Sequence, residues 1–248
     1  MRAVAAKAPA LDERTVRPNR LSGTSRSRNI WRMQAGALTD YAIRLFERGY
    51  ICLPLRAGGK HLDLAAMEYD PLHLRTLRKD LKELAFTSIT FQLAQKPPGR
   101  SDVARWFGDF AGNVGILGGF ANLMILDFDD DAGYRAWRSS HKAIANGTPI
   151  AKSPSGFHVY LRTREPVVSS SLHFGLRRVG HAKALGGYVV GCPSELKDGS
   201  SYSWIEGQSP FDMEPQVVGN LDSLSLRPVS MLKHCYDRLL KRGFFEQQ

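Results

Sequence analysis

The residues with the clearest chemical meaning lie in an apolar segment that ends in a run of acids. Residues 123–131 read LMILDFDDD. Because side chains alternate along a strand, Asp127 and Asp129 share one face and the phenylalanine between them points into the core. Two carboxylates one strand step apart can hold Mg²⁺ or Mn²⁺ and leave room for phosphate oxygens and water. The alternative is an acidic strand-to-helix turn in which Asp130 or Asp131 caps the following helix.

A second candidate is the turn SPSGFHVY, residues 153–160. Ser155 and Gly156 predict a tight turn, and His158 enters the strand that follows. The hydroxyl and the exposed backbone N–H groups of such a turn suit a phosphate, and the imidazole is close enough to donate a hydrogen bond. The simpler interpretation is a turn serine followed by a partly buried histidine.

A third segment, HAKALGGYVVGCPS, spans residues 181–194 and places glycines at the head of an apolar strand. Gly186 and Gly187 permit a close approach of the backbone to a ligand. His181 and Lys183 precede them and share one face of an extended chain. By itself this segment carries little specificity.

Several familiar motifs are absent or incomplete. A calcium loop that started at Asp127 would need glycine at Ala132 and glutamate at Arg138. A Walker phosphate loop fails because the Gly-Lys dipeptide that ends at Lys60 is followed by histidine rather than Ser or Thr. A nucleophile elbow would need glycine at Ser153, which disfavours a serine hydrolase. Neither His-Glu-x-x-His nor Cys-x-x-Cys occurs, so a zinc enzyme is also disfavoured.

Length and composition limit the classes to which the chain can belong. With 248 residues, 43% hydrophobic and 23% charged, it can bury a substantial core and is not disordered as a whole. No apolar run is long enough to cross a bilayer, and the first residues lack the apolar segment of a secretory signal. Three widely spaced cysteines exclude a disulfide scaffold. We therefore expect a protein of a reducing compartment that has no membrane partner.

The net charge of +10 favours a polyanionic partner, and much of it lies in residues 1–36, where eight Lys and Arg residues face two acids. This segment has no helical or strand period, so we expect a basic, flexible tail. Phosphate contact, a solvated extension and an organelle-targeting leader all stay open for it. Residues 213–248 form a C-terminal extension, in which SMLKHCYDRLLKRG predicts a closing amphipathic helix.

Between these ends, hydrophobic periodicity predicts helices and strands in mixed order. A charged helix is expected over the leucines of residues 72–84, and Ser101 is the expected N-cap of a short helix. Strands and helices do not alternate strictly, so an α+β fold is favoured over a doubly wound parallel sheet. The other expected helices are 38–48 and 131–145, and the expected strands are 50–55, 113–119, 123–129, two short strands within 148–163, 186–194 and a hairpin over 198–204.

Taken in order, the acid pair, the Ser-Gly-x-His turn and the Gly-Gly-Tyr strand resemble the bifunctional primase–polymerase (Prim-Pol) domain of the archaeo-eukaryotic primase superfamily. The likeness extends upstream to GYICLPLRAGGK and ARWFGDFAGNVGILGG, and downstream through GYVVGCPSELKDGSSYSWIEGQSP. It covers about residues 40–212, and the ordered set is more specific than any one motif. The resemblance implies a Prim-Pol catalytic domain over residues 37–212, with an RRM-like mixed or antiparallel sheet core and flanking helices.

The same resemblance implies a template-dependent DNA primase and polymerase, which transfers nucleotides from dNTP or NTP to a 3′-hydroxyl during replication of a mobile element or phage. Its partners would be a DNA primer-template or single-stranded template and a separate helicase, in the cytoplasm of a bacterial, archaeal or phage system. Carried over by position, Asp127 and Asp129 would bind Mg²⁺ or Mn²⁺ and, with His158, form the catalytic set. The residues that would contact the nucleotide are Ser155, Gly156, His158, Lys183 and Gly187.

The sequence departs from the family pattern at the third metal ligand. Many relatives carry an acid at the position of His181, and a neutral imidazole binds Mn²⁺ better than Mg²⁺. This leaves open a preference for manganese with His181 as a ligand, a single protein-held metal with the other carried by the nucleotide, or an impaired enzyme. If another carboxylate completes the metal site, the candidates are Asp130, Asp131 and Glu206. We expect an active enzyme; the rivals are a non-catalytic nucleic-acid-binding module and a metal-dependent phosphodiesterase or nuclease.

Overall fold

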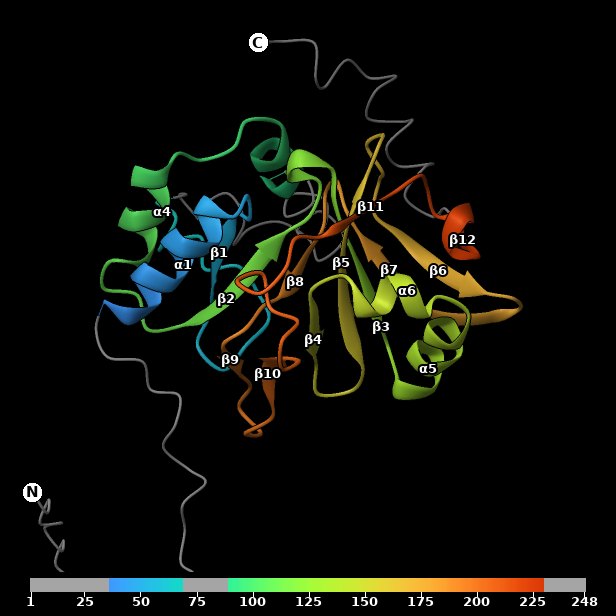
Figure 1. Ribbon diagram of the computed structural model, residues 1–248. Helices are drawn as coiled ribbons and strands as arrows, with labels where there is room; N and C mark the ends of the chain where they lie inside the picture. The colour runs from blue at the N-terminus through green and yellow to red at the C-terminus, as the bar shows by residue number, and fades with distance from the viewer. Residues whose placement is uncertain (1–35, 69–88, 230–248) are drawn as a thin grey trace, which may run out of the picture. The chain divides into compact units, whose positions relative to one another are not determined.

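The computed structural model describes residues 36–68 and 89–229. Two sheets with flanking helices confirm the expected α+β class (Figure 1). Nearly all of the basic tail, the helix expected over residues 72–84 and the expected closing helix lie outside the described residues. Within the described part of the chain, no helix has the length and apolar character needed to cross a membrane.

The first sheet has three antiparallel strands in the order β1-β2-β8. Every residue of β1 and β2 is buried, which explains why these strands read as continuous hydrophobic runs without alternation. Helices α1 and α4 pack against each other beside this sheet (Figure 1). The bounds are α1 Ala37–Glu47, β1 Cys52–Leu55, α4 Arg100–Phe107, β2 Asn113–Leu117 and β8 Tyr188–Val190.

The second sheet has nine strands among the described residues, in the order β12-β6-β7-β3-β5-β4-β10-β9, with β11 attached to β5. Strand β11 runs parallel to β5 and continues the edge that β4 occupies for the first half of that strand. The other pairs are antiparallel, so the core sheet is mixed, as expected. The bounds are β3 Leu123–Phe128, β4 Ile150–Lys152, β5 Phe157–Thr163, β6 Ser170–Phe174, β7 Arg177–Lys183, β9 Ser194–Glu195, β10 Ser201–Trp204, β11 Gln216–Val218 and β12 Leu226–Val229.

Strand β3 lies between two hydrophobic cores. Ile125 belongs to the core shared with the first sheet, whereas Leu126 and Phe128 belong to the second core. Since side chains alternate with a period of two, Asp127 must project from the same face as Ile125. The packing of the apolar residues on both sides therefore directs this carboxylate toward the first sheet.

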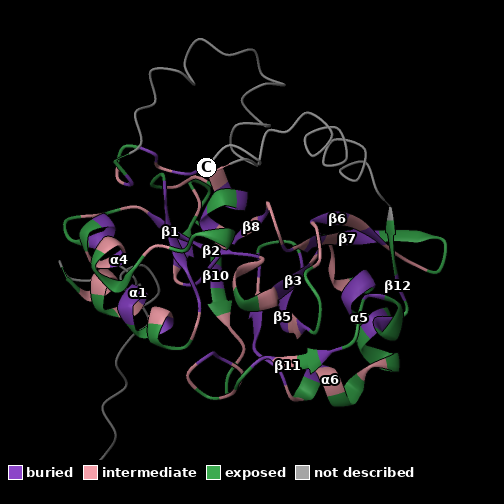
Figure 2. Ribbon diagram, turned by 90° about the horizontal axis from the view of Figure 1, so that it is seen from above, coloured by how far each residue is buried: buried purple, intermediate pink, exposed green. Residues whose placement is uncertain are grey.

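Helices α5 (Asp131–Ser140) and α6 (Lys142–Asn146) contribute to the second core. The single helix expected over residues 131–145 is divided at His141, whose backbone is not helical. The His141 ring stacks on buried Trp137, and its Nδ1 lies 3.0 Å from the Trp137 carbonyl oxygen, a contact that replaces a regular helical bond. In Figure 2 the outer surface of α6 is largely exposed, whereas β3 is buried.

Two features of local structure differ from the sequence predictions. Ser101 lies inside α4, and the N-cap is Gly99, whose N–H donates to the Asp102 carboxylate at 2.8 Å. Asp102, the third residue of the helix, therefore binds the backbone N–H of the N-cap residue, which is the contact that the acid of a capping box makes. The hairpin β6–β7 is not predicted at all, because exposed arginines and histidines interrupt the apolar alternation that identifies a strand.

Gly180 allows β7 to lie directly against β3 next to Asp127. Its φ is 151°, and a Cβ at this position would lie 1.9 Å from the Asp127 carbonyl oxygen. We expect Gly180→Ala to lower the free energy of unfolding by about 3 kcal/mol, because the backbone and the contact would both be strained. Urea denaturation measures this change.

The matched control is Gly219→Ala, whose Cβ would meet no atom closer than 4.0 Å. It should alter the free energy of unfolding by less than about 1 kcal/mol. Equal losses in Gly180→Ala and Gly219→Ala would contradict the packing argument.

Candidate active site

The centre of the site is Asp127, near the end of β3. Its backbone pairs with His158 on β5 and with His181 on β7. Directly paired residues of neighbouring strands project from the same face, so the carboxylate lies between two imidazoles. The contact with His158 is direct, with 3.2 Å between Nε2 and Oδ1, and the His158 side chain is only 4% exposed.

Burial and charge act in opposite directions on Asp127. Burial, the largest influence, would raise the pKa of this carboxyl group, but the hydrogen bond and electrostatic attraction from His158 and the positive charge of Lys183 together outweigh it. The pKa of Asp127 therefore lies below its usual value. The group is ionised at neutral pH, which is the form that binds a metal ion.

Asp129 follows the end of β3 and is fixed by a hydrogen bond of 2.9 Å from its N–H to the Val179 carbonyl oxygen. Its carboxylate faces β7: Oδ2 lies 3.3 Å from Arg178 Nη2, and Oδ1 lies 3.8 Å from His181 Nδ1. Burial, and then the charge of Lys183, lower the pKa of His181, so its ring is neutral at pH 7. Arg178 is therefore the charged partner of Asp129.

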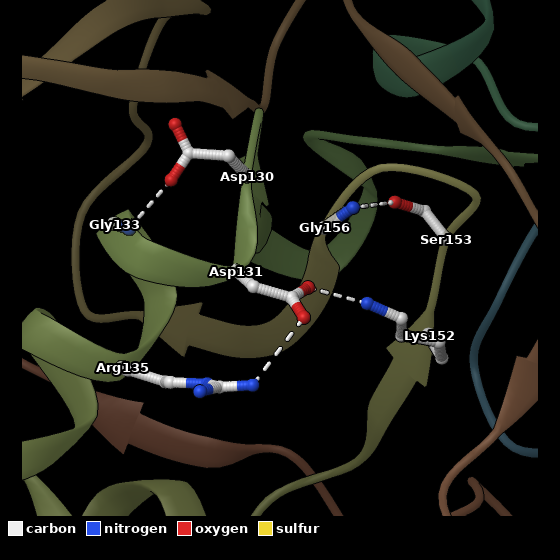
Figure 3. A network of polar contacts seen from close by, with 7 residues as sticks. All are labelled: Asp130, Asp131, Gly133, Arg135, Lys152, Ser153 and Gly156. Carbon is white, nitrogen blue, oxygen red and sulfur yellow. Dashed lines mark hydrogen bonds and ion pairs between the residues drawn. The ribbon is translucent and has the colours of Figure 1, made fainter.

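The turn between β4 and β5 brings Ser155 to the same end of the sheet. Ser153 closes this turn, because its Oγ accepts a hydrogen bond of 2.9 Å from the Gly156 N–H (Figure 3). Position 156 also requires glycine for a steric reason, because a Cβ there would lie 2.0 Å from the Phe128 carbonyl oxygen. The turn thus rests against the strand that carries the acids, and Ser155 is exposed on it.

A cavity of about 480 Å³ opens where these elements meet. Strands β3, β5 and β7 of the second sheet and β8 of the first contribute to its wall. Two residues predicted from the sequence, Gly156 and His181, do not line this cavity. Gly156 lies against the backbone of β3, and His181 lies next to Asp129. The predicted residues that line it are Asp127, Asp129, Ser155, His158, Lys183 and Gly187.

The first sheet and its loop supply the opposite wall. Lys60 and His61 follow β1 and line the cavity together with Tyr188 of β8. The Tyr188 hydroxyl donates a hydrogen bond of 3.0 Å to the Lys60 carbonyl oxygen, which ties the loop to the sheet. A basic side chain after the Gly-Gly turn was visible in the sequence, but its place opposite the acids depends on how the two sheets pack.

Sequence reasoning missed Tyr202 of β10. Its ring centroid lies 5.7 Å from that of His158. Burial, followed by the negative charge of Asp127, raises the pKa of Tyr202 to about 12, so the hydroxyl keeps its proton and can donate. Three other cavity residues, His61, Thr90 and Ser153, were not among the predicted site residues.

The remaining acidic candidates have partners away from the cavity. Asp130 caps α5 and also binds Arg177, with 2.7 Å between Oδ2 and Nη2. Asp131 forms an ion pair with Lys152 and another with an arginine one helical turn later (Figure 3). Glu206 is exposed in the turn after β10. None of these three carboxylates lines the cavity, and the capping interpretation holds for Asp130.

The donor set suits a metal ion that a substrate helps to hold. Across residues 36–68 and 89–229, no three His, Cys, Asp or Glu side chains gather closely enough to form a metal-binding group. Mg²⁺ is often held by one or two carboxylates together with waters and substrate phosphates, and Asp127 and Asp129 offer those two carboxylates. The assignment of His181 as a ligand stays a prediction.

All residues that line this cavity lie within a segment that matches a known protein family. The family model described as "Bifunctional DNA primase/polymerase, N-terminal" matches residues 42–217. The chain belongs to this family. A comparison with curated proteins finds no match.

Membership of the Prim-Pol family confirms the resemblance found in the sequence motifs. It implies a nucleotidyltransferase-type enzyme that acts on DNA and nucleotides. The matched range overlaps the Prim-Pol domain expected over residues 37–212, whose limits stay a prediction.

The buried contact between His158 and Asp127 provides a test of this Prim-Pol site. We expect His158→Ala to lower the free energy of unfolding by about 2 kcal/mol, because Asp127 would lose its hydrogen bond and stay largely buried. Denaturation followed by circular dichroism measures the loss. His61→Ala is the control, since His61 lines the same cavity but is exposed. A similar loss in the control would show that the contact with Asp127 is not the cause.

Proposed function

We propose that the chain is a template-dependent DNA primase–polymerase, which transfers a nucleotide from dNTP or NTP to a 3′-hydroxyl group during replication of a mobile element or phage. The observation that carries this proposal is the convergence of Asp127, Asp129, Ser155 and Lys183 on one cavity. Two carboxylates and a lysine around a space of this size suit a triphosphate with a divalent ion, Mg²⁺ or Mn²⁺.

In the proposed reaction, the 3′-oxygen of the primer forms a bond with the α-phosphorus while the bond from that phosphorus to the bridging oxygen breaks. The hydroxyl gives its proton to solvent water, and pyrophosphate leaves with the electron pair of the broken bond. A divalent ion held by Asp127 and Asp129 would supply charge neutralisation and a lower pKa for the 3′-hydroxyl. Such transfer needs little covalent help from the protein, whose contribution is positioning and electrostatics.

Each side chain around the cavity has a separate role in the proposed reaction. His158 holds Asp127 in its ionised form and in a fixed orientation. Lys183 lies on the cavity wall, where its fixed charge would face the phosphates and the developing charge of the leaving group. Lys60 provides a second cation from the opposite wall, and Ser155 offers a hydroxyl donor at the exposed turn.

The acid pair gives the direct test of this function. Asp127→Asn and Asp129→Asn should each reduce incorporation of a labelled dNTP on a primed template by about a thousandfold or more, because several kcal/mol of transition-state stabilisation would be lost. Gel analysis of primer extension with Mg²⁺ or Mn²⁺ measures the rate. Asp222→Asn is the control, because Asp222 is exposed and does not line the cavity, and it should retain the wild-type rate.

Three outcomes of that assay separate the proposal from its rivals. Extension by the wild type that disappears in both acid variants supports a polymerase. A wild type that binds single-stranded DNA but never extends the primer would favour the non-catalytic module. Shortening of the labelled primer that added dNTP does not reverse would favour the phosphodiesterase or nuclease.

The lysine on the cavity wall gives a second test. Lys183→Ala should raise the KM for dNTP about tenfold or more, because a charge-assisted contact with the phosphates would be lost. Steady-state primer extension at varied dNTP measures KM and kcat. Lys197→Ala, which removes an exposed lysine outside the cavity, should leave both constants unchanged. An unaltered KM in Lys183→Ala would remove this residue from the nucleotide contacts.

A further inference from the structure

A β-bulge in β7 turns an arginine toward the acids of the site. The pairing of β7 with β6 shifts at this point: Leu172 lies opposite Gly180, but the next residue, His173, lies opposite Arg178. One extra residue on β7 reverses the alternation of its side chains. In a regular strand, Arg178 and His181 would project from opposite faces, because they are three residues apart. The bulge places them on the same face.

Arg178 uses this position to contact both Asp129 and His181. Its Nη2 lies 3.3 Å from Asp129 Oδ2 and 3.1 Å from His181 Nε2. A guanidinium group only donates, so His181 Nε2 must accept, and the ring proton of the neutral imidazole is then on Nδ1, the atom nearer to Asp129. The lone pair that His181 would offer to a metal ion is engaged by Arg178.

Each acid of the described site has a positive charge near it. Arg178 forms an ion pair with Asp129, and the charge of Lys183 acts on Asp127. A site with two protein-held ions would need a further ligand beside Asp129. Within the described residues no group of three metal-ligating side chains forms, and Asp129 is instead paired with Arg178.

We propose that Arg178 is a fixed cation of the active site, which neutralises Asp129 in place of a second divalent ion, so that the only divalent ion required arrives with the nucleotide. This inference rests on the proposed function and deepens it, because it assigns the charge at Asp129 to a side chain. His181 then acts as a positioning residue that holds the guanidinium group. The bulge and Gly180, which lets β7 approach β3, build this arrangement.

Binding of Mn²⁺ in the absence of nucleotide tests the proposal independently of catalysis. The electron paramagnetic resonance signal of free Mn²⁺ reports how much of the ion the full chain binds. Arg178→Met should tighten Mn²⁺ binding about tenfold, because it removes a positive charge that lies next to Asp129 and repels the ion. Arg178→Lys retains the charge and should stay close to the wild type. Mn²⁺ affinity in Arg178→Met that equals or falls below the wild-type value would overturn the proposal.

The matched control is Arg177→Met. Arg177 is the neighbouring arginine, has a similar exposure and binds Asp130 outside the cavity. Its removal should leave the Mn²⁺ affinity at the wild-type value. Tightening of equal size in Arg177→Met and Arg178→Met would mean that overall charge, and not the contact with Asp129, governs binding, and would also overturn the proposal. Circular dichroism melts verify that each variant is folded.

The metal dependence of primer extension separates this inference from the function on which it rests. At saturating dNTP, the wild type should need no divalent ion beyond that bound to the nucleotide, whereas Arg178→Met should need excess free Mn²⁺ for its full rate. If the wild type extends primers but Arg178→Met does not bind Mn²⁺ more tightly, the role of Arg178 fails and the function stands. If Arg178→Met tightens Mn²⁺ binding but the wild type never extends a primer, the function fails and the charge role stands.

Discussion

The register of β3 between β5 and β7 is the constraint on which the site depends. Both edges of β3 are hydrogen-bonded and both faces are buried, so its apolar side chains are divided between two cores. A slip of one residue would send Asp127 into the core that holds Phe128 and Trp137 and bring Phe128 to the cavity. The position of the acid is therefore fixed by hydrophobic packing along the strand, before any polar group contributes to it.

The polar groups then resolve the electrostatic problem that this burial creates. A carboxylate largely removed from water is costly unless it is hydrogen-bonded and paired with positive charge. His158 and Lys183 meet this requirement for Asp127, and Arg178 meets it for Asp129. Two of these residues, His158 and Lys183, also line a cavity large enough for a triphosphate. Stabilisation of the empty site and attraction of a polyanion are thus two consequences of one arrangement of charge.

How much of this could be predicted from the sequence depends on whether the signal is local. The acids of β3 and the turn that carries Ser155 follow from alternation and turn chemistry within a few residues, and the structure brings them to one cavity. The place of Tyr202 depends on the packing of distant strands, which no local pattern encodes. Arg178 is harder still, because the bulge reverses the alternation from which its direction would be deduced. Regular alternation counted from His181 would place the Arg178 side chain on the opposite face of the sheet.

Two features, a histidine at position 181 and the contact of Arg178 with Asp129, both reduce the repulsion between negative charges in the site. An acid at position 181 would stand beside Asp127 on the neighbouring strand and near Asp129, so three carboxylates would repel one another until cations arrived. A neutral imidazole removes that repulsion, and its acceptor nitrogen holds the guanidinium group against Asp129. On the proposal made for Arg178, the fold does not require a metal ion to balance this charge, so that folding and metal binding are separate events. The ion then enters only when a nucleotide brings phosphate oxygens to complete its coordination, which makes metal binding a step of substrate binding.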